Sequence, residues 1–98
     1  MNQNTNNLLV VDFDEKELDI KYLKYTILIQ EKNIMPFFHG TAQQFIKVND
    51  LNHLFSNGFI SGKITNSPIK FRRTKQDEDL TGKLIFNRVG KFGVDIHA

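Results

Sequence analysis

A chain of 98 residues with 40% hydrophobic residues, 24% charged residues and no cysteine can close one hydrophobic core but has no disulfide to support it. The absence of cysteine also excludes thiolate catalysis and zinc sites built on cysteine ligands. The net charge of +2 conceals an asymmetry, because residues 1–57 carry five basic and seven acidic side chains whereas residues 58–98 carry eight basic and four acidic ones.

The polar stretch at residues 1–7, MNQNTNN, has no apolar surface to bury, so we expect a disordered tail there. The apolar, partly β-branched sequence LLVVDF at residues 8–13 predicts the first strand. Residues 14–22 are ambiguous. Asp14 followed by Glu17 resembles a helix capping box, whereas the alternation of apolar residues over 18–22 favours a strand, which is the preferred interpretation.

A second strand is predicted over residues 23–30, because their apolar residues alternate with period two. The sequence EKN predicts a turn after it, and IMPFFH at residues 34–39 predicts an antiparallel neighbour that begins near Pro36 or lies at an edge. QQFIKV at residues 43–48 is expected to be extended.

One short helix is predicted between Asn49, a good N-cap, and Gly58, which suits the left-handed position after a helix. Leu51, Leu54 and Phe55 recur at helical spacing and should face inward. Such a short helix needs a sheet to pack on.

The remainder of the chain predicts an antiparallel meander of four short strands, FISGKI, IKFRRTK, KLIFNRV and KFGVDIHA, joined by the turns TNSP and QDEDLTG. Residues 8–98 are therefore expected to form a single globular domain of the α+β class, mostly β. The expected fold is an antiparallel sheet or a small curled barrel with one short internal helix. The predicted core comprises Leu23, Tyr25, Ile27, Ile29, Leu51, Leu54, Phe55, Ile64, Phe71, Phe86, Val94 and Ile96.

Catalytic constellations are not apparent in the sequence. His39, His53 and His97 lack partners at metal-ligand spacing, and no serine lies in a glycine-flanked nucleophile elbow. Asp12 and Asp14 could hold Mg²⁺, but a polar strand end is the simpler interpretation. We therefore expect a protein without enzymatic activity, cofactor or metal. No apolar run approaches the roughly 18 residues of a membrane span, and none resembles a signal peptide, so a cytoplasmic location without membrane attachment is expected.

The stretch IKFRRTK carries four cations, Lys70, Arg72, Arg73 and Lys75, and Arg88 and Lys91 follow on strands expected to lie nearby. Cations for phosphates, with an aromatic residue for base stacking, are typical of surfaces that bind single-stranded nucleic acid. Phe71 alternates with Ile69 and Arg73, however, which favours a place in the core.

The order of elements in FFHGTAQQFIKV, NDLNHLF, GFISGKI and IKFRR resembles that of small bacterial immunity proteins, which neutralise the toxic domains of delivered effectors. The resemblance covers residues 20–98. It implies a cytosolic protein without cofactor or reaction that binds a cognate toxin. A phage-encoded inhibitor would have a similar layout.

Immunity proteins against nucleases are often acidic, whereas the second half of this chain is basic, which argues against a nuclease target or moves the expected interface to the first half. The expected partner-binding residues are Asp12, Asp14, Glu15, Glu17 and Asp19. The leading hypothesis is thus a binding protein that inhibits a toxin domain or another target enzyme. The alternative is a small barrel that binds single-stranded nucleic acid through Lys70, Arg72, Arg73, Lys75, Arg88 and Lys91.

Overall fold

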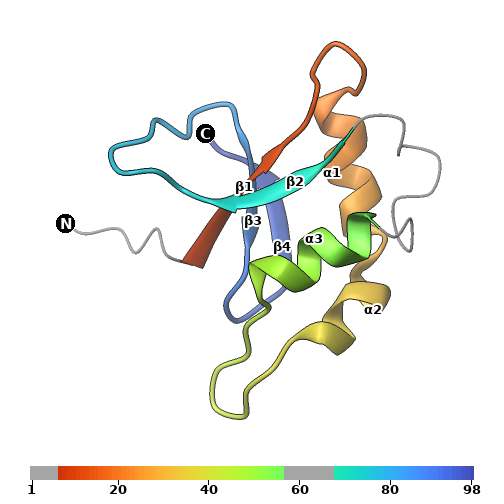
Figure 1. Cartoon of the computed structure of the whole chain (residues 1–98), viewed down its shortest axis with the longest axis vertical. Helices are drawn as coiled ribbons and strands as arrows, with labels where there is room; N and C mark the ends of the chain where they lie inside the picture. The colour runs from red at the N-terminus through yellow and green to blue at the C-terminus, as the bar shows by residue number, and fades with distance from the viewer. Residues whose placement is uncertain (1–6, 57–67) are drawn as a thin grey trace.

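The computed structural model describes residues 7–56 and 68–98, so the predicted tail over residues 1–6 and the predicted strand at 59–64 lie outside the described residues. One antiparallel sheet is formed by β1 (Leu8–Asp12), β2 (Lys70–Arg73), β3 (Leu84–Asn87) and β4 (Gly93–Ile96) (Figure 1). The helical elements are α1 (Ile20–Leu28), α2 (Glu31–Ile34), the 3₁₀ helix η2 (Met35–Phe37) and α3 (Val48–Ser56). The α+β class with an antiparallel sheet is confirmed. The sheet formed by the described residues is open and is not a barrel.

The strand order is β2-β1-β3-β4, which differs from the predicted meander. β3 and β4 do form a hairpin, but β1 lies between β2 and β3, with Val11 opposite Phe71 and Leu9 opposite Phe86. The apolar first strand thereby gains a neighbour on both sides, which suits a segment that is buried along most of its length.

The strands predicted over residues 14–22 and 23–30 are wrong, because residues 14–19 form a loop and residues 20–28 form α1. The helix begins after Asp19, whose side chain accepts a hydrogen bond of 3.0 Å from the backbone N–H of Tyr22. This cap satisfies one of the amides that a helix leaves unpaired at its start. Leu23 and Ile27, one turn apart, are buried.

The turn expected at EKN and the strand expected at IMPFFH are also wrong, since these residues form α2 and η2. The extended geometry begins only beyond η2, where His39 and Phe45 exchange backbone hydrogen bonds of 2.7 and 2.8 Å. Phe45 also bridges to Val89, so the predicted extended stretch at residues 43–48 is present in part.

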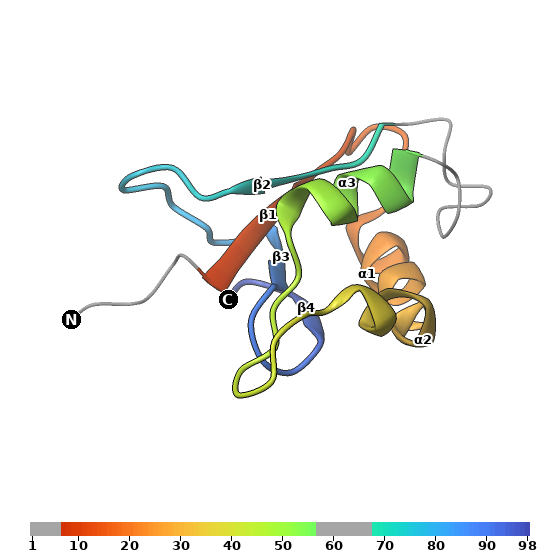
Figure 2. The same cartoon turned by 60° about the horizontal axis from the view of Figure 1, so that its bottom comes forward.

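The main core lies between the sheet and the helices, with α1 packed against β4 and α3 against β2 (Figure 2). Four aromatic rings run through it in sequence from α3 across the sheet. The centroid separations are 4.9 Å for Phe55 and Phe71, 5.4 Å for Phe71 and Phe86, and 5.6 Å for Phe86 and Phe92. Phenylalanine thus joins the helix to the strands by tilted and edge-to-face contacts.

The predicted core is confirmed for its buried members Leu23, Ile27, Leu51, Leu54, Phe55, Phe71, Phe86 and Val94. Ile96 is half-buried, and Ile64 lies outside the described residues. Tyr25 and Ile29 were placed wrongly, because both are exposed on α1.

The outer edge of β2 is closed by a side chain of α3. The amide nitrogen of Asn52 donates to the carbonyl of Phe71 at 3.0 Å, and its oxygen accepts from the N–H of Phe71 at 2.8 Å. An edge strand otherwise presents such groups unpaired. This pair of hydrogen bonds fixes α3 alongside β2.

The opposite face of the sheet carries a smaller apolar cluster of Val10, Leu80 and Ile85 under the loop between β2 and β3. Arg72 stands opposite Val10 on this face. Its guanidinium donates to Asp12 at 2.6 Å and to both carboxylate oxygens of Glu78 at 3.0 and 2.7 Å. The loop is therefore held to the sheet mainly by charged hydrogen bonds.

Candidate functional site

The acidic residues expected to bind a partner lie along residues 12–19, the end of β1 and the loop that leads into α1, which we call the acidic loop. Three of them have local roles. Asp12 pairs with Arg72, Asp14 accepts the backbone N–H of Lys16 at 2.9 Å, and Asp19 caps α1.

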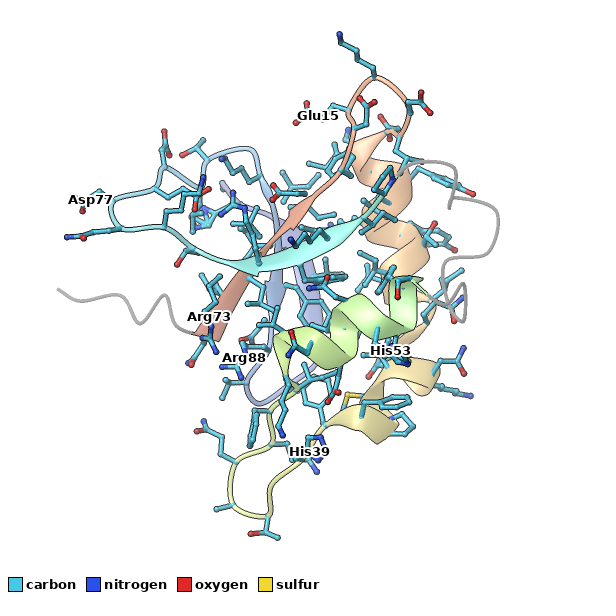
Figure 3. The ribbon with its side chains drawn as sticks, viewed as in Figure 1. Glu15, His39, His53, Arg73, Asp77 and Arg88 are labelled. Atoms are coloured by element: carbon cyan, nitrogen blue, oxygen red, sulfur yellow. The ribbon has the colours of Figure 1, made fainter. Side chains whose placement is uncertain are left out.

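Glu15 and Glu17 of the acidic loop are exposed. Figure 3 shows Glu15 at the tip of the loop, far from Arg73 and Arg88. The structure thus keeps the expected acidic interface and the basic residues on separate parts of the molecule.

A row of apolar side chains continues from the acidic loop along the outer face of α1. Tyr22, Tyr25 and Ile29 are 54%, 64% and 60% exposed, and their spacing places them on neighbouring positions of one helix face. We call these three residues the α1 surface. Sequence reasoning missed it, because the alternation over residues 23–30 assigned Tyr25 and Ile29 to the core.

The basic residues gather at a second place, a groove of about 640 Å³ between β2 and the start of α3, which we call the β2–α3 groove. Its lining residues are Lys47, Val48, Asn49, Asn52, Lys70, Phe71, Arg72, Arg73 and Arg88. None of them is acidic. Lys47 and Asn52 were not predicted as site residues, and nothing in the sequence near them marks a groove.

Arg88 is the most firmly positioned cation of this groove. Its Nε donates to the carbonyl of Ile46 at 3.1 Å, and its guanidinium lies over the ring of Phe45 at 5.8 Å from the centroid. Burial lowers the pKa of Arg88, and the charge of Arg73 lowers it further. Figure 3 shows these two arginines close to the start of α3.

The other predicted nucleic-acid residues differ in position. The guanidinium of Arg72 is turned to the opposite face and paired there with Asp12 and Glu78. Lys75 lies in the loop after β2, where its backbone N–H donates to Glu78 at 2.8 Å. Lys91 lines a different hollow beside Phe92. Lys70 lies two residues from Arg72 and therefore faces the same side of the sheet, although it borders the groove. Of the predicted set, Arg73 and Arg88 direct uncompensated charge to the groove.

Metal ligands are not clustered in the part of the chain that the structure describes, where no group of three histidine or acidic residues could hold an ion. His39 approaches Asp50 at 3.5 Å, and His97 interacts with the carbonyl of Ala98 at 3.1 Å. The three histidines belong to different elements, and Asp12 and Asp14 are engaged as described above.

No helix among the described residues is long and apolar enough to cross a membrane. Comparison with known proteins found no matching family model, no matching curated protein and no matching solved structure.

Proposed function

We propose that this chain is a non-enzymatic binding protein that inhibits a partner protein, with the toxin domain of a delivered effector as the expected target. The observation that carries the proposal is the α1 surface beside the acidic loop. Large apolar side chains exposed in a row, unlike single ones scattered over a surface, are typical of interaction sites.

The chemistry of this region suits a protein partner with a basic surface. Tyrosine is enriched at interfaces, since it offers a rigid apolar ring with a polar tip. The exposed carboxylates of Glu15 and Glu17 lie on the loop that leads into α1. Carboxylates at the rim of an interface accelerate encounter with a basic partner, while apolar anchors slow its release.

The first test titrates the product of the gene directly upstream, the position expected for a cognate toxin, into the purified protein in a calorimeter. The double change Tyr22→Ala and Tyr25→Ala should weaken binding by about 10- to 100-fold, because truncated aromatic anchors cost roughly 1–3 kcal/mol at an interface. The matched control is Phe37→Ala, which removes a partly exposed ring from η2, away from α1. It should bind as the wild type does.

Growth of cells that express the toxin domain provides the functional readout. The wild-type chain should restore growth, and the tyrosine double variant should not. A wild-type chain that neither binds this domain nor protects cells from it would refute the proposal.

A second test distinguishes an effect of the acidic loop on association from an effect of the net charge of the protein. Glu15→Lys should slow association by several-fold at low salt, an effect that salt screens, while leaving dissociation nearly unchanged. Glu31→Lys on α2 makes the same change of charge at another exposed position and is the control. Equal slowing by the two variants would show that only the net charge matters.

A further inference from the structure

We propose that the β2–α3 groove is a second binding site, which holds the phosphates of a single-stranded nucleic acid and leaves its bases in solvent. Its residues differ from those of the α1 surface, and its charge is opposite to that of the acidic loop. It therefore goes beyond the proposed protein-binding function.

The charge of the groove is not compensated by the protein itself. Lys47, Arg73 and Arg88 line it, and none of the ion pairs among the described residues involves any of these three. Arg72, which lies between Lys70 and Arg73 on the same strand, shows the contrast, because its charge is taken up by two carboxylates. A groove with three uncompensated cations and no acid attracts a polyanion.

Arg88 is positioned in advance for such a ligand. Its hydrogen bond to Ile46 and its place over Phe45 restrict its motion, so that less side-chain entropy is lost when a phosphate binds. Burial and, to a smaller extent, repulsion by Arg73 lower the pKa of Arg88, and an anion between the two arginines would relieve the repulsion.

The ring geometry argues against base stacking. Phe71, the aromatic residue of the basic strand, is fully buried, and Phe45 contacts the guanidinium of Arg88. Stacking needs an open aromatic face, and the groove lining offers none. Binding through phosphates alone is independent of sequence and sensitive to salt.

The shape favours a flexible single strand over a duplex. The cations lie in a hollow between a helix and an edge strand, with Asn52 bridging the two at its base. A single strand can follow such a hollow, whereas a stiff duplex touches only the rim. Three phosphate contacts predict a log-log salt slope of about −2, since each contact on a single strand contributes roughly −0.7.

The test measures fluorescence anisotropy of a labelled thymidine 20-mer between 50 and 200 mM salt with the full chain. The wild type should bind with a dissociation constant of about 10⁻⁴ to 10⁻⁶ M near physiological salt, and with the slope given above. The double variant Lys47→Glu and Arg73→Glu should bind at least about tenfold more weakly and lose roughly 1.4 from the slope. Its melting temperature, followed by circular dichroism, shows whether it is folded, and Lys47→Gln with Arg73→Gln replaces it if it is not.

The matched control is Lys32→Glu with Lys91→Glu, which changes the net charge equally at exposed positions outside the groove. It should reduce affinity by less than about threefold. Equal losses in the two double variants would overturn the proposal in favour of general attraction by net charge, and so would the absence of binding by the wild type.

Two further arms decide the ligand class. In the first arm, inorganic pyrophosphate competes with the 20-mer. Displacement at a pyrophosphate concentration no higher than the dissociation constant of the 20-mer would identify a site for small phosphate compounds and overturn the proposal. Equal or tighter binding of a duplex would overturn the preference for single strands. The groove variant should still bind the protein partner as the wild type does, so failure of this site is distinct from failure of the proposed function.

Discussion

The two sides of strand β2 use neighbouring arginines for different purposes. Arg72 points to the loop-covered face, where Asp12 and Glu78 neutralise it and where it holds the β2–β3 loop to the sheet. Arg73 points to the helix-covered side and lines the β2–α3 groove. Because side chains alternate along a strand, a cluster of cations in the sequence divides into a structural half and an available half.

The comparison extends to what stabilises each face. The helix-covered face buries a large core that contains the row of phenylalanine rings, whereas the loop-covered face buries a small cluster and relies on charged hydrogen bonds. The first depends on packing and should be insensitive to pH. The second should depend on pH and on single charges.

The largest loss should come from the helix-covered face. Phe71→Ala removes a fully buried ring that contacts Phe55 and Phe86, and should lower the free energy of unfolding by about 3–5 kcal/mol. Urea denaturation followed by circular dichroism measures this loss. Phe37→Ala, at a partly exposed ring, is the control. A loss below about 1 kcal/mol for Phe71→Ala would mean that the ring is not part of the main core.

The second prediction compares the adjacent arginines directly. Arg72→Met should cost about 1.5–3 kcal/mol, because it leaves the carboxylate of Glu78, whose side chain is only 9% exposed, without its main partner. Arg73→Met should stay within about 0.5 kcal/mol of the wild type in the same denaturation experiment. Equal costs would contradict the division between the two sides of the strand. A charge reversal at Arg72 is for the same reason unsuitable as a probe of nucleic-acid binding.

The pH dependence of stability provides a third and smaller effect. Hydrogen bonds from the Arg72 side chain and then from the Lys75 backbone hold the pKa of Glu78 well below its usual range. The unfolded chain, in which this pKa is about 4.3, then binds more protons than the folded one in acid. The contribution of Glu78 to stability is therefore present above about pH 4.3 and declines as the pH falls below it.

Unfolding titrations of the wild type and of Glu78→Gln between pH 7 and pH 3 isolate this contribution. The difference in stability between the two proteins should shrink as the pH falls, while the remaining carboxylates affect both alike. A difference that stays constant with pH would show that Glu78 is not held as a carboxylate by Arg72.

The smallest effect is expected on α1. Tyr25→Ser should change stability by no more than about 0.5 kcal/mol, because the ring is exposed and the two residues have similar helix propensities. The same change at a buried strand position would cost several-fold more. Thermal denaturation followed by circular dichroism distinguishes the two outcomes. A large loss of stability would show that Tyr25 packs in the core.

The error over residues 23–30 has a simple physical cause. Positions four apart share a face both in a strand and in a helix, so Leu23 and Ile27 satisfy either pattern. The strand was predicted because Tyr25 and Ile29 are apolar and complete the alternation, but both side chains are exposed in the folded protein. The prediction of a helix with Leu51, Leu54 and Phe55 facing inward was right, because these residues fit only the helical period. The N-cap predicted at Asn49 was wrong, since α3 begins at Val48 and the carbonyl of Lys47 accepts its first hydrogen bonds, while Gly58 lies outside the described residues.

The groove and the ion pairs depend on contacts that a linear pattern cannot provide. Lys47 and Arg88 meet because Ile46 and Arg88 exchange hydrogen bonds, and Arg73 borders the same groove because Asn52 fixes α3 to the edge of β2, although β1 is inserted between β2 and β3. The pair of Asp12 and Arg72 is a consequence of the same insertion. Residue types on β2 could be predicted from sequence, but their partners could not.

The placement of the tyrosines also gives the protein a built-in optical probe. The chain contains two tyrosines and no tryptophan, and both tyrosines stand on the exposed face of α1. Intrinsic ultraviolet emission of the free protein therefore originates from the α1 surface alone. Unfolding moves these rings from one aqueous environment to another, whereas a macromolecule that covers the helix removes them from water, so the emission distinguishes docking at α1 from loss of structure without any added label.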